Sequence, residues 1–304
     1  MRFTVRQRPL LACAALAACV ALAPVSAQQA PEKVDHDAIY KIKEEGFQRS
    51  RVMETMSWLT DVYGPRLTNS PGYRKAGDWA VKELTSWGLS NARLEPFPFG
   101  RGWANEKFSM TATTPGGSFP VIGMSQGWTP GTDGPVSADA VFAVLDTDDD
   151  LARFKGKLRG KVVLLQNLRE VSALWTPPAT RYNQQQLDDL QRETDSIPRR
   201  GRGRFGARAN GPGRQGGRGD GPQTFAQRRM QFLKDEGALA MVSAGTRGDG
   251  GTVFVQGGGS REPNAPATLP SIVISVEHYG RMARTLQKGL PVRTDLDIRD
   301  TFFD

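Results

Sequence analysis

Apolar residues recur at helical spacing between residues 50 and 63. The repeating positions are Val52, Met56, Leu59 and Val62. Ser50 is a suitable N-cap for this helix, because a serine hydroxyl can accept a hydrogen bond from the first helical turn. Gly64-Pro65 should end the helix, since proline disfavours the helical conformation of the residue before it. A helix with fewer apolar positions is predicted just before, at residues 35–49.

The next helix is bounded by stronger signals at both ends. Ser70 can cap it, and Pro71 suits the first helical position because its missing N–H would be unpaired there in any case. One apolar stripe follows, made of Tyr73, Ala76, Ala80, Leu84 and Trp87. Gly88 is a typical terminating residue. Residues 91–99 then have an extended pattern, and a strand is predicted there.

From about residue 103 the helical period gives way to short apolar runs separated by turn residues. Strands are predicted at residues 103–114, 119–122, 138–145, 161–165, 239–243, 269–274 and 291–298. Helices are predicted at residues 182–197, 224–236 and 276–287. Many short strands with a few helices indicate a β-rich α+β module. Residues 127–135 are rich in Gly, Pro, Thr and Asp, so a boundary between two domains is expected at about residue 130.

The first 27 residues have the pattern of a secretory signal peptide, with a basic start, an apolar centre and small residues before Gln28. Cleavage is expected after Ala27, which would place the protein in the periplasm or outside the cell. An alternative is a lipid anchor on Cys19, because residues 16–19 resemble a lipobox. Both cysteines, Cys13 and Cys19, lie in this segment, so no disulfide is expected in the mature chain. No permanent membrane span is expected either.

The formal charge of +8 over 304 residues has one local source. Nine arginines and a single aspartate lie between residues 199 and 229, so that segment alone carries the excess. Residues 198–223 are rich in arginine and glycine and bury nothing, which predicts a disordered insert. Such tracts can bind phosphates, but an exported protein meets little nucleic acid. Nucleic-acid partners are therefore not expected.

Three short stretches resemble the opening of the co-catalytic dizinc aminopeptidases. They are LTDVYGPRLT at residues 59–68, WGL at 87–89 and EPF at 95–97. This family includes secreted bacterial aminopeptidases, glutamate carboxypeptidase and the catalytically inactive transferrin receptors. The resemblance implies that residues 28–130 are the incomplete N-terminal portion of an α/β peptidase domain that acts on peptides or proteins.

Three later stretches resemble the protease-associated domain, a module often inserted in these peptidases. They are GKLRGKVVLL at residues 156–165, FLKDEGALAMVSA at 232–244 and LPSIVISVEHYGRMARTL at 269–286. The resemblance implies a protease-associated domain at residues 131–300, interrupted by the Arg/Gly insert. Residues 301–304 would then begin the catalytic half. The predicted fold class is accordingly a mixture of α/β and α+β.

The dizinc family holds its metals with a His-x-Asp motif, a bridging Asp, a Glu-Glu pair, another carboxylate and a distant His. This sequence contains only His36 and His278, and neither has the required spacing. No catalytic or metal-binding residue is therefore assigned to this chain, and zinc is expected only in the full-length enzyme. The chain is interpreted as a fragment that is inactive alone and supplies scaffold and substrate-access surfaces. The alternative is a non-catalytic secreted module that binds proteins.

Three further motifs suggest other chemistry. Ser125 lies in a G-x-S-x-G pattern with His278 downstream, as in serine hydrolases, although Pro130 follows where a helix should start. Residues 146–150 begin like a calcium loop but lack its glycine and its final glutamate, so capping of a short helix is preferred. Residues 257–259 are three glycines without the lysine of a phosphate loop, which favours a turn.

Overall fold

The computed structural model describes residues 34–196 and 224–304, except for positions 174, 178 and 180. The predicted signal peptide and the Arg/Gly insert at residues 198–223 lie outside these residues. The chain divides into two units, Met1–Trp58 and Leu59–Asp304.

The described part of the first unit is helical. It contains α2 (His36–Gln48) and α3 (Val52–Ser57), which confirms that both stretches are helical. Asp35 caps α2 by accepting a hydrogen bond from the Ala38 N–H at 2.9 Å. Ser50 was predicted to cap α3; its hydroxyl accepts a hydrogen bond from the N–H of Val52, the first residue of α3, at 3.4 Å, although Arg51 lies between them at the N-cap position.

The second unit begins in a π-helical turn, η1 (Trp58–Val62), where a regular α-helix was predicted. Helix α4 (Pro71–Ser86) follows with the expected ends. The Ser70 hydroxyl accepts a hydrogen bond from the Tyr73 N–H at 3.2 Å. Gly88 has a φ of 89°, a left-handed conformation that glycine adopts without strain. The strand predicted at residues 91–99 is wrong, because these residues pair with no strand of the described chain.

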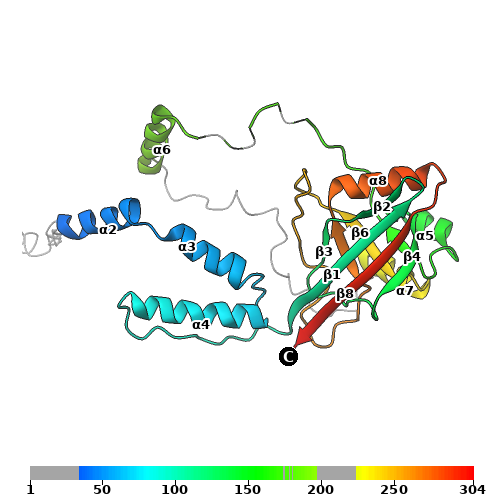
Figure 1. The fold of residues 1–304 in the computed structure, drawn as a ribbon, viewed down its shortest axis with the longest axis horizontal. Helices are drawn as coiled ribbons and strands as arrows, with labels where there is room; N and C mark the ends of the chain where they lie inside the picture. The colour runs from blue at the N-terminus through cyan, green and yellow to red at the C-terminus, as the bar shows by residue number, and fades with distance from the viewer. Residues whose placement is uncertain (1–33, 174, 178, 180, 197–223) are drawn as a thin grey trace, which may run out of the picture. The chain divides into compact units, whose positions relative to one another are not determined.

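The rest of the second unit is one mixed sheet of eight strands, in the order β2-β1-β8-β4-β5-β6-β7-β3. The strands are β1 (Gly102–Thr114), β2 (Gly117–Pro120), β3 (Gly123–Ser125), β4 (Val136–Phe142), β5 (Val162–Leu164), β6 (Ala240–Ala244), β7 (Ser271–Ile274) and β8 (Arg293–Phe303). The strands from β4 to β7 are parallel to one another, whereas the other pairings are antiparallel. Figure 1 shows β1 and β8 as the longest pair.

The sheet curls so that its two ends approach each other. β2 and β3 lie at opposite ends of the strand order but are joined by only two residues. Val121 donates a backbone hydrogen bond to Met110 of β1 at 2.8 Å. Ile122 accepts one from Ser275, just after β7, also at 2.8 Å. This short connection therefore links the first strand pair to the last.

Helices cover both faces of the parallel strands: α5 (Asp148–Phe154), α7 (Phe225–Asp235) and α8 (Val276–Gln287). Successive strand residues point to opposite faces, so Val162 and Leu164 pack in one apolar cluster with α8. Val163 packs in a second cluster with α5 and α7. A further helix, α6 (Gln184–Ser196), lies between β5 and α7 in the sequence. The mixed α+β and α/β class predicted from the sequence is confirmed.

The predicted boundary at residue 130 does not separate two folding units. β1, β2 and β3 precede it, yet they belong to the same sheet as β4 to β8. β1 pairs with β8 from Gly102 opposite Phe303 to Thr113 opposite Arg293. The sheet therefore begins at Gly102, and residues 301–303 form the end of β8.

Candidate functional site

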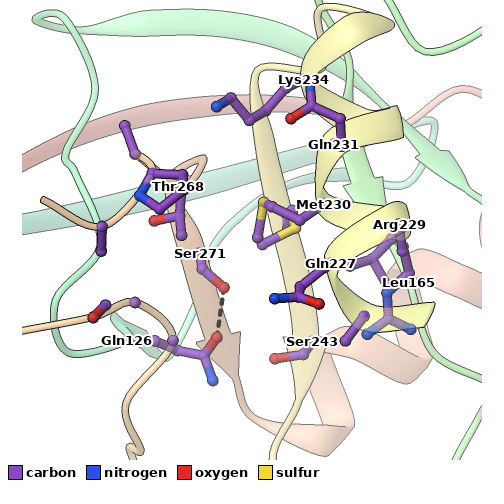
Figure 2. Close-up of a pocket in the computed structure, with 18 of the residues that line it drawn as sticks. Gln126, Leu165, Gln227, Arg229, Met230, Gln231, Lys234, Ser243, Thr268 and Ser271 are labelled. Atoms are coloured by element: carbon purple, nitrogen blue, oxygen red, sulfur yellow. Dashed lines mark hydrogen bonds between the residues drawn. The ribbon is translucent and has the colours of Figure 1, made fainter. Parts of the chain in front are cut away.

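A cavity of about 700 Å³ lies between α7, the neighbouring strands and the loop at residues 258–268. Figure 2 shows α7 along one side, with Gln227, Met230 and Lys234 directed towards the cavity. β6 contributes Ser243, and the turn after β5 contributes Gln166. The sequence alone did not indicate this site, because its residues come from separate segments that share no motif.

Four glutamine side chains line the cavity. Gln231 donates its amide N–H to Asp235 at 2.7 Å, whereas in the other three the amide oxygen already accepts a hydrogen bond. The Gln166 oxygen accepts from the Ala244 N–H at 3.0 Å, and the Gln227 oxygen accepts from the Thr224 N–H at 2.8 Å. The Gln126 oxygen accepts from the Ser271 hydroxyl, as the dashed line in Figure 2 shows. The amide orientations are thereby set by their partners, and each of these three glutamines keeps its NH₂ group as a donor.

Two cations lie at the cavity. Arg229 donates to the Leu145 carbonyl at 3.2 Å and lies 3.9 Å from the Asp146 carboxylate, so its charge is partly offset. The Lys234 ammonium makes no hydrogen bond or ion pair with any residue that the structure describes. Met230 and Met241 add thioether groups, which make an apolar and adaptable surface.

The wall opposite α7 depends on a close approach of two backbone segments. Gly258 and Gly259 both donate to the Gly127 carbonyl, at 2.9 and 3.1 Å. A Cβ atom on Gly259 would lie 1.6 Å from the Trp128 carbonyl oxygen, so only glycine fits. The three glycines at residues 257–259 therefore hold this wall in place. A turn had been favoured there, whereas Gly257 forms a bridge to Gly127.

Ser125 does not have the surroundings of a hydrolytic nucleophile. It is 1% exposed at the end of β3, and no helix follows it. Its hydroxyl and the Oδ2 atom of Asp300 are both buried, and neither makes a hydrogen bond to a described residue. Asp300 Oδ1 accepts from the Asn105 amide at 2.7 Å. Burial raises the pKa of Asp300 to about 6, against the opposing effects of the nearby Asn105 and Ser125 side chains.

His278 serves to close the sheet. Its Nδ1 atom accepts a hydrogen bond from the Ile122 N–H at 3.0 Å, so that nitrogen carries no proton. The imidazole lies 5.4 Å from the Phe119 ring, between centroids. Burial lowers the pKa of His278, and the charge of Arg281 lowers it further, while Glu277 acts in the opposite direction. His278 thus holds the connection between β2 and β3, and its Nδ1 atom is bonded to Ile122 rather than to Ser125.

Changing His278 to asparagine should reduce the pH dependence of stability between pH 7 and pH 5. The pKa of His278 is lower in the folded protein than the ordinary value of about 6.5. Its contribution is therefore complete above that value and is lost as the pH falls through the folded pKa. The asparagine oxygen can accept from Ile122 without titrating. Urea unfolding of both proteins at several pH values measures this, and equal pH profiles would contradict it.

The acidic run at residues 146–150 is a helix cap. Asp150 accepts hydrogen bonds from the N–H groups of Asp146 and Thr147, and Thr147 caps α5 in return. Asp148 pairs with Arg228 at 3.1 Å. These carboxylates are therefore engaged in local contacts. The prediction that this run caps a short helix rather than forming a calcium loop is confirmed.

Zinc does not fit the residues present. Among the described residues, no group of three or more His, Cys, Asp or Glu side chains could hold a metal ion. The whole sequence offers two histidines. His36 is an exposed residue at the start of α2. The Nδ1 atom of His278 already accepts a hydrogen bond from the Ile122 N–H.

The fold places this protein in the mixed α/β class, with a single curled sheet of eight strands in the described residues. No protein-family model and no curated protein matches the sequence. Among solved structures, an aminopeptidase from Aneurinibacillus sp. strain AM-1 is similar at 16% identity and a TM-score of 0.41, over 84% of this chain and 46% of that one.

Two other solved structures are similar at the same level. A peptidase M28 precursor from Shewanella amazonensis SB2B matches at 18% identity and a TM-score of 0.45, over 88% of this chain and 52% of that chain. BSAP, a zinc aminopeptidase from Bacillus subtilis, matches at 12% identity and a TM-score of 0.39, over 82% and 44%. This chain thus spans about half the length of each neighbour.

Proposed function

We propose that this chain is the N-terminal part of an exported zinc-dependent aminopeptidase whose metal-binding residues lie outside it. In the whole enzyme, two zinc ions would activate the water that hydrolyses a peptide bond. The residues of this chain do not fit the metals, so its own part would be to provide scaffold and substrate-access surfaces. The resemblance of residues 59–68, 87–89 and 95–97 to the opening of such enzymes supports this proposal.

The observation that carries the proposal is an exposed apolar surface around α4. A hollow of about 980 Å³ lies there, between α4, residues 93–99 and the end of β8. Its apolar lining includes Tyr73, Leu94 and Phe97, which are 44%, 47% and 59% exposed. Contiguous exposed apolar surface of this kind is typical of a region that packs against further protein.

The extended segment beside this hollow supports the same conclusion. Residues 92–99 make no backbone hydrogen bond to any described residue. Unpaired extended backbone readily adds to another strand, and Phe97 and Leu94 would then be covered. The catalytic half of the parent enzyme is the proposed partner for this surface.

The reading frame after residue 304 tests the proposal directly. It should encode a His-x-Asp motif and a Glu-Glu pair. The longer protein should retain about two zinc ions per chain and cleave leucyl substrates with sensitivity to a chelator. In the longer protein, the amides of residues 92–99 should exchange more slowly than in the present chain, because they gain hydrogen-bond partners.

The present chain should neither retain zinc in stoichiometric amounts nor cleave aminoacyl substrates, since its two histidines cannot supply the ligands. The assay uses protein without a histidine tag, loaded with zinc and desalted. Stoichiometric zinc with chelator-sensitive turnover would show that the fragment proposal is wrong. Activity that is unaffected by the chelator but is lost in Ser125→Ala would instead support a serine hydrolase.

Export is part of the proposal and rests on residues 1–27. No helix in the described part of the chain is long and apolar enough to cross a membrane. The mass of the mature protein distinguishes cleavage before Gln28 from a lipidated Cys19. An uncleaved protein retained in the cell would contradict both.

A further inference from the structure

We propose that the cavity beside α7 binds a short peptide through its C-terminal carboxylate and its backbone carbonyl groups. This inference goes beyond the proposed function, because it needs neither zinc nor a catalytic half. A peptide-binding site in this chain would stand whether or not the parent is an aminopeptidase.

The cavity offers an excess of hydrogen-bond donors. Each of Gln126, Gln166 and Gln227 lines it, and each has its amide oxygen occupied. Within the described residues, no hydrogen bond uses the three NH₂ groups. In Figure 2 the amide nitrogen of Gln227 points away from α7. A ligand that complements fixed donors must supply acceptors, and peptide carbonyl groups do so at regular intervals.

A free cation is present at the same cavity. Lys234 lies on α7 two turns beyond Gln227, and its ammonium group makes no ion pair or hydrogen bond with the described residues. Arg229 is already held by Asp146 and the Leu145 carbonyl. Lys234 is therefore the group that can receive a carboxylate, through a charge-assisted hydrogen bond.

The remaining surface favours a peptide over other anionic ligands. Met230, Met241 and Leu165 form an apolar part that suits an aliphatic side chain. The lining contains no aromatic side chain, and stacking on aromatic rings is the usual means of holding bases. A volume of about 700 Å³ is in the range of sites for small ligands, large enough for a tripeptide.

Titration calorimetry on the purified chain, with no added metal, tests the inference. The probe is N-acetyl-Ala-Ala-Leu with a free carboxylate, compared with the same peptide as its C-terminal amide. The free acid should bind, and the amide should bind roughly tenfold or more weakly because it cannot pair with Lys234. Sodium phosphate at the same ionic strength should not displace the peptide.

Three variants distinguish binding in this cavity from nonspecific effects of charge and stability on peptide affinity. Lys234→Met keeps the apolar stem and should weaken binding roughly tenfold, whereas Lys288→Met, at an exposed lysine at the end of α8, should leave it unchanged. Gln227→Glu keeps the oxygen that the Thr224 cap requires but replaces the donor by a second acceptor. It should therefore abolish binding without lowering the melting temperature.

The results that would overturn the inference are equally specific. Equal affinity for the free acid and the amide would show that the cavity does not recognise the C-terminal carboxylate. Displacement by phosphate would show a general anion site rather than a peptide site. Full affinity in Gln227→Glu or in Lys234→Met, or no binding of the free acid at millimolar concentration, would show that the cavity does not take this ligand.

Discussion

Replacing Asp300 by asparagine is expected to stabilise the protein by about 2 kcal/mol at pH 8. Asp300 is half-buried, but its Oδ2 atom and the nearby Ser125 hydroxyl are shielded from solvent and make no well-formed hydrogen bond to a described residue. An asparagine keeps an oxygen for the Asn105 amide and gains an NH₂ group that can donate to Ser125. The variant thus removes a buried charge and pairs a buried hydroxyl.

The gain should depend on pH in a defined direction. The pKa of Asp300 is raised from 3.8 to about 6 by burial. A raised carboxyl pKa contributes stability that is complete below the unfolded value and is lost as the pH rises through the folded value. The difference between the two proteins should therefore be small at pH 4, grow between pH 4 and 6, and stay constant above that range.

Urea unfolding at pH 4, 6 and 8 measures the effect. Asp133→Asn is the matched control, because Asp133 is exposed in a turn and should change stability little at any pH. A destabilised Asp300→Asn at pH 8 would mean that the carboxylate has a favourable partner in the folded protein.

Replacing Tyr279 by phenylalanine is expected to destabilise the protein by about 2 kcal/mol. Tyr279 is fully buried on α8, and its hydroxyl accepts from the Gln166 N–H at 2.7 Å and donates to the Gln166 carbonyl at 2.6 Å. Loss of the hydroxyl leaves both backbone groups of Gln166 without that partner. Burial also raises the pKa of Tyr279 to about 12, so the hydroxyl stays protonated at every working pH.

This change should also weaken peptide binding, because Gln166 is one of the glutamines with a free NH₂ group in the cavity. Thermal and urea unfolding measure the stability, and calorimetry measures the binding. Tyr182→Phe is the control, since Tyr182 is 62% exposed and should tolerate the loss of its hydroxyl. Unchanged stability in Tyr279→Phe would show that water replaces the hydroxyl at Gln166.

The cavity illustrates which features the sequence could not predict. Gln227 and Lys234 share a helix that was predicted correctly, yet the partners that give them a role come from β5, β6 and the loop at residues 258–268. No period or short motif connects these segments. Gln126 was noticed only as part of a serine hydrolase pattern, and the structure instead bonds it to Ser271.

The sequence by itself determined the local elements. Ser70, Pro71 and Gly88 defined the ends of α4, and Thr224 defined the start of α7, because capping depends on neighbouring residues alone. Complete burial of β5 likewise follows from a short apolar run between turns.

Only the tertiary structure decided which strands pair. β1 joins β8 across nearly the whole second unit, and this pairing places residues 102–125 in the same sheet as the strands that follow residue 130. The segment at residues 91–99 has strand-like residues but finds no partner among the described residues. A strand requires hydrogen bonds from a distant part of the chain, whereas a capped helix satisfies its own, so helices could be predicted here and the sheet could not.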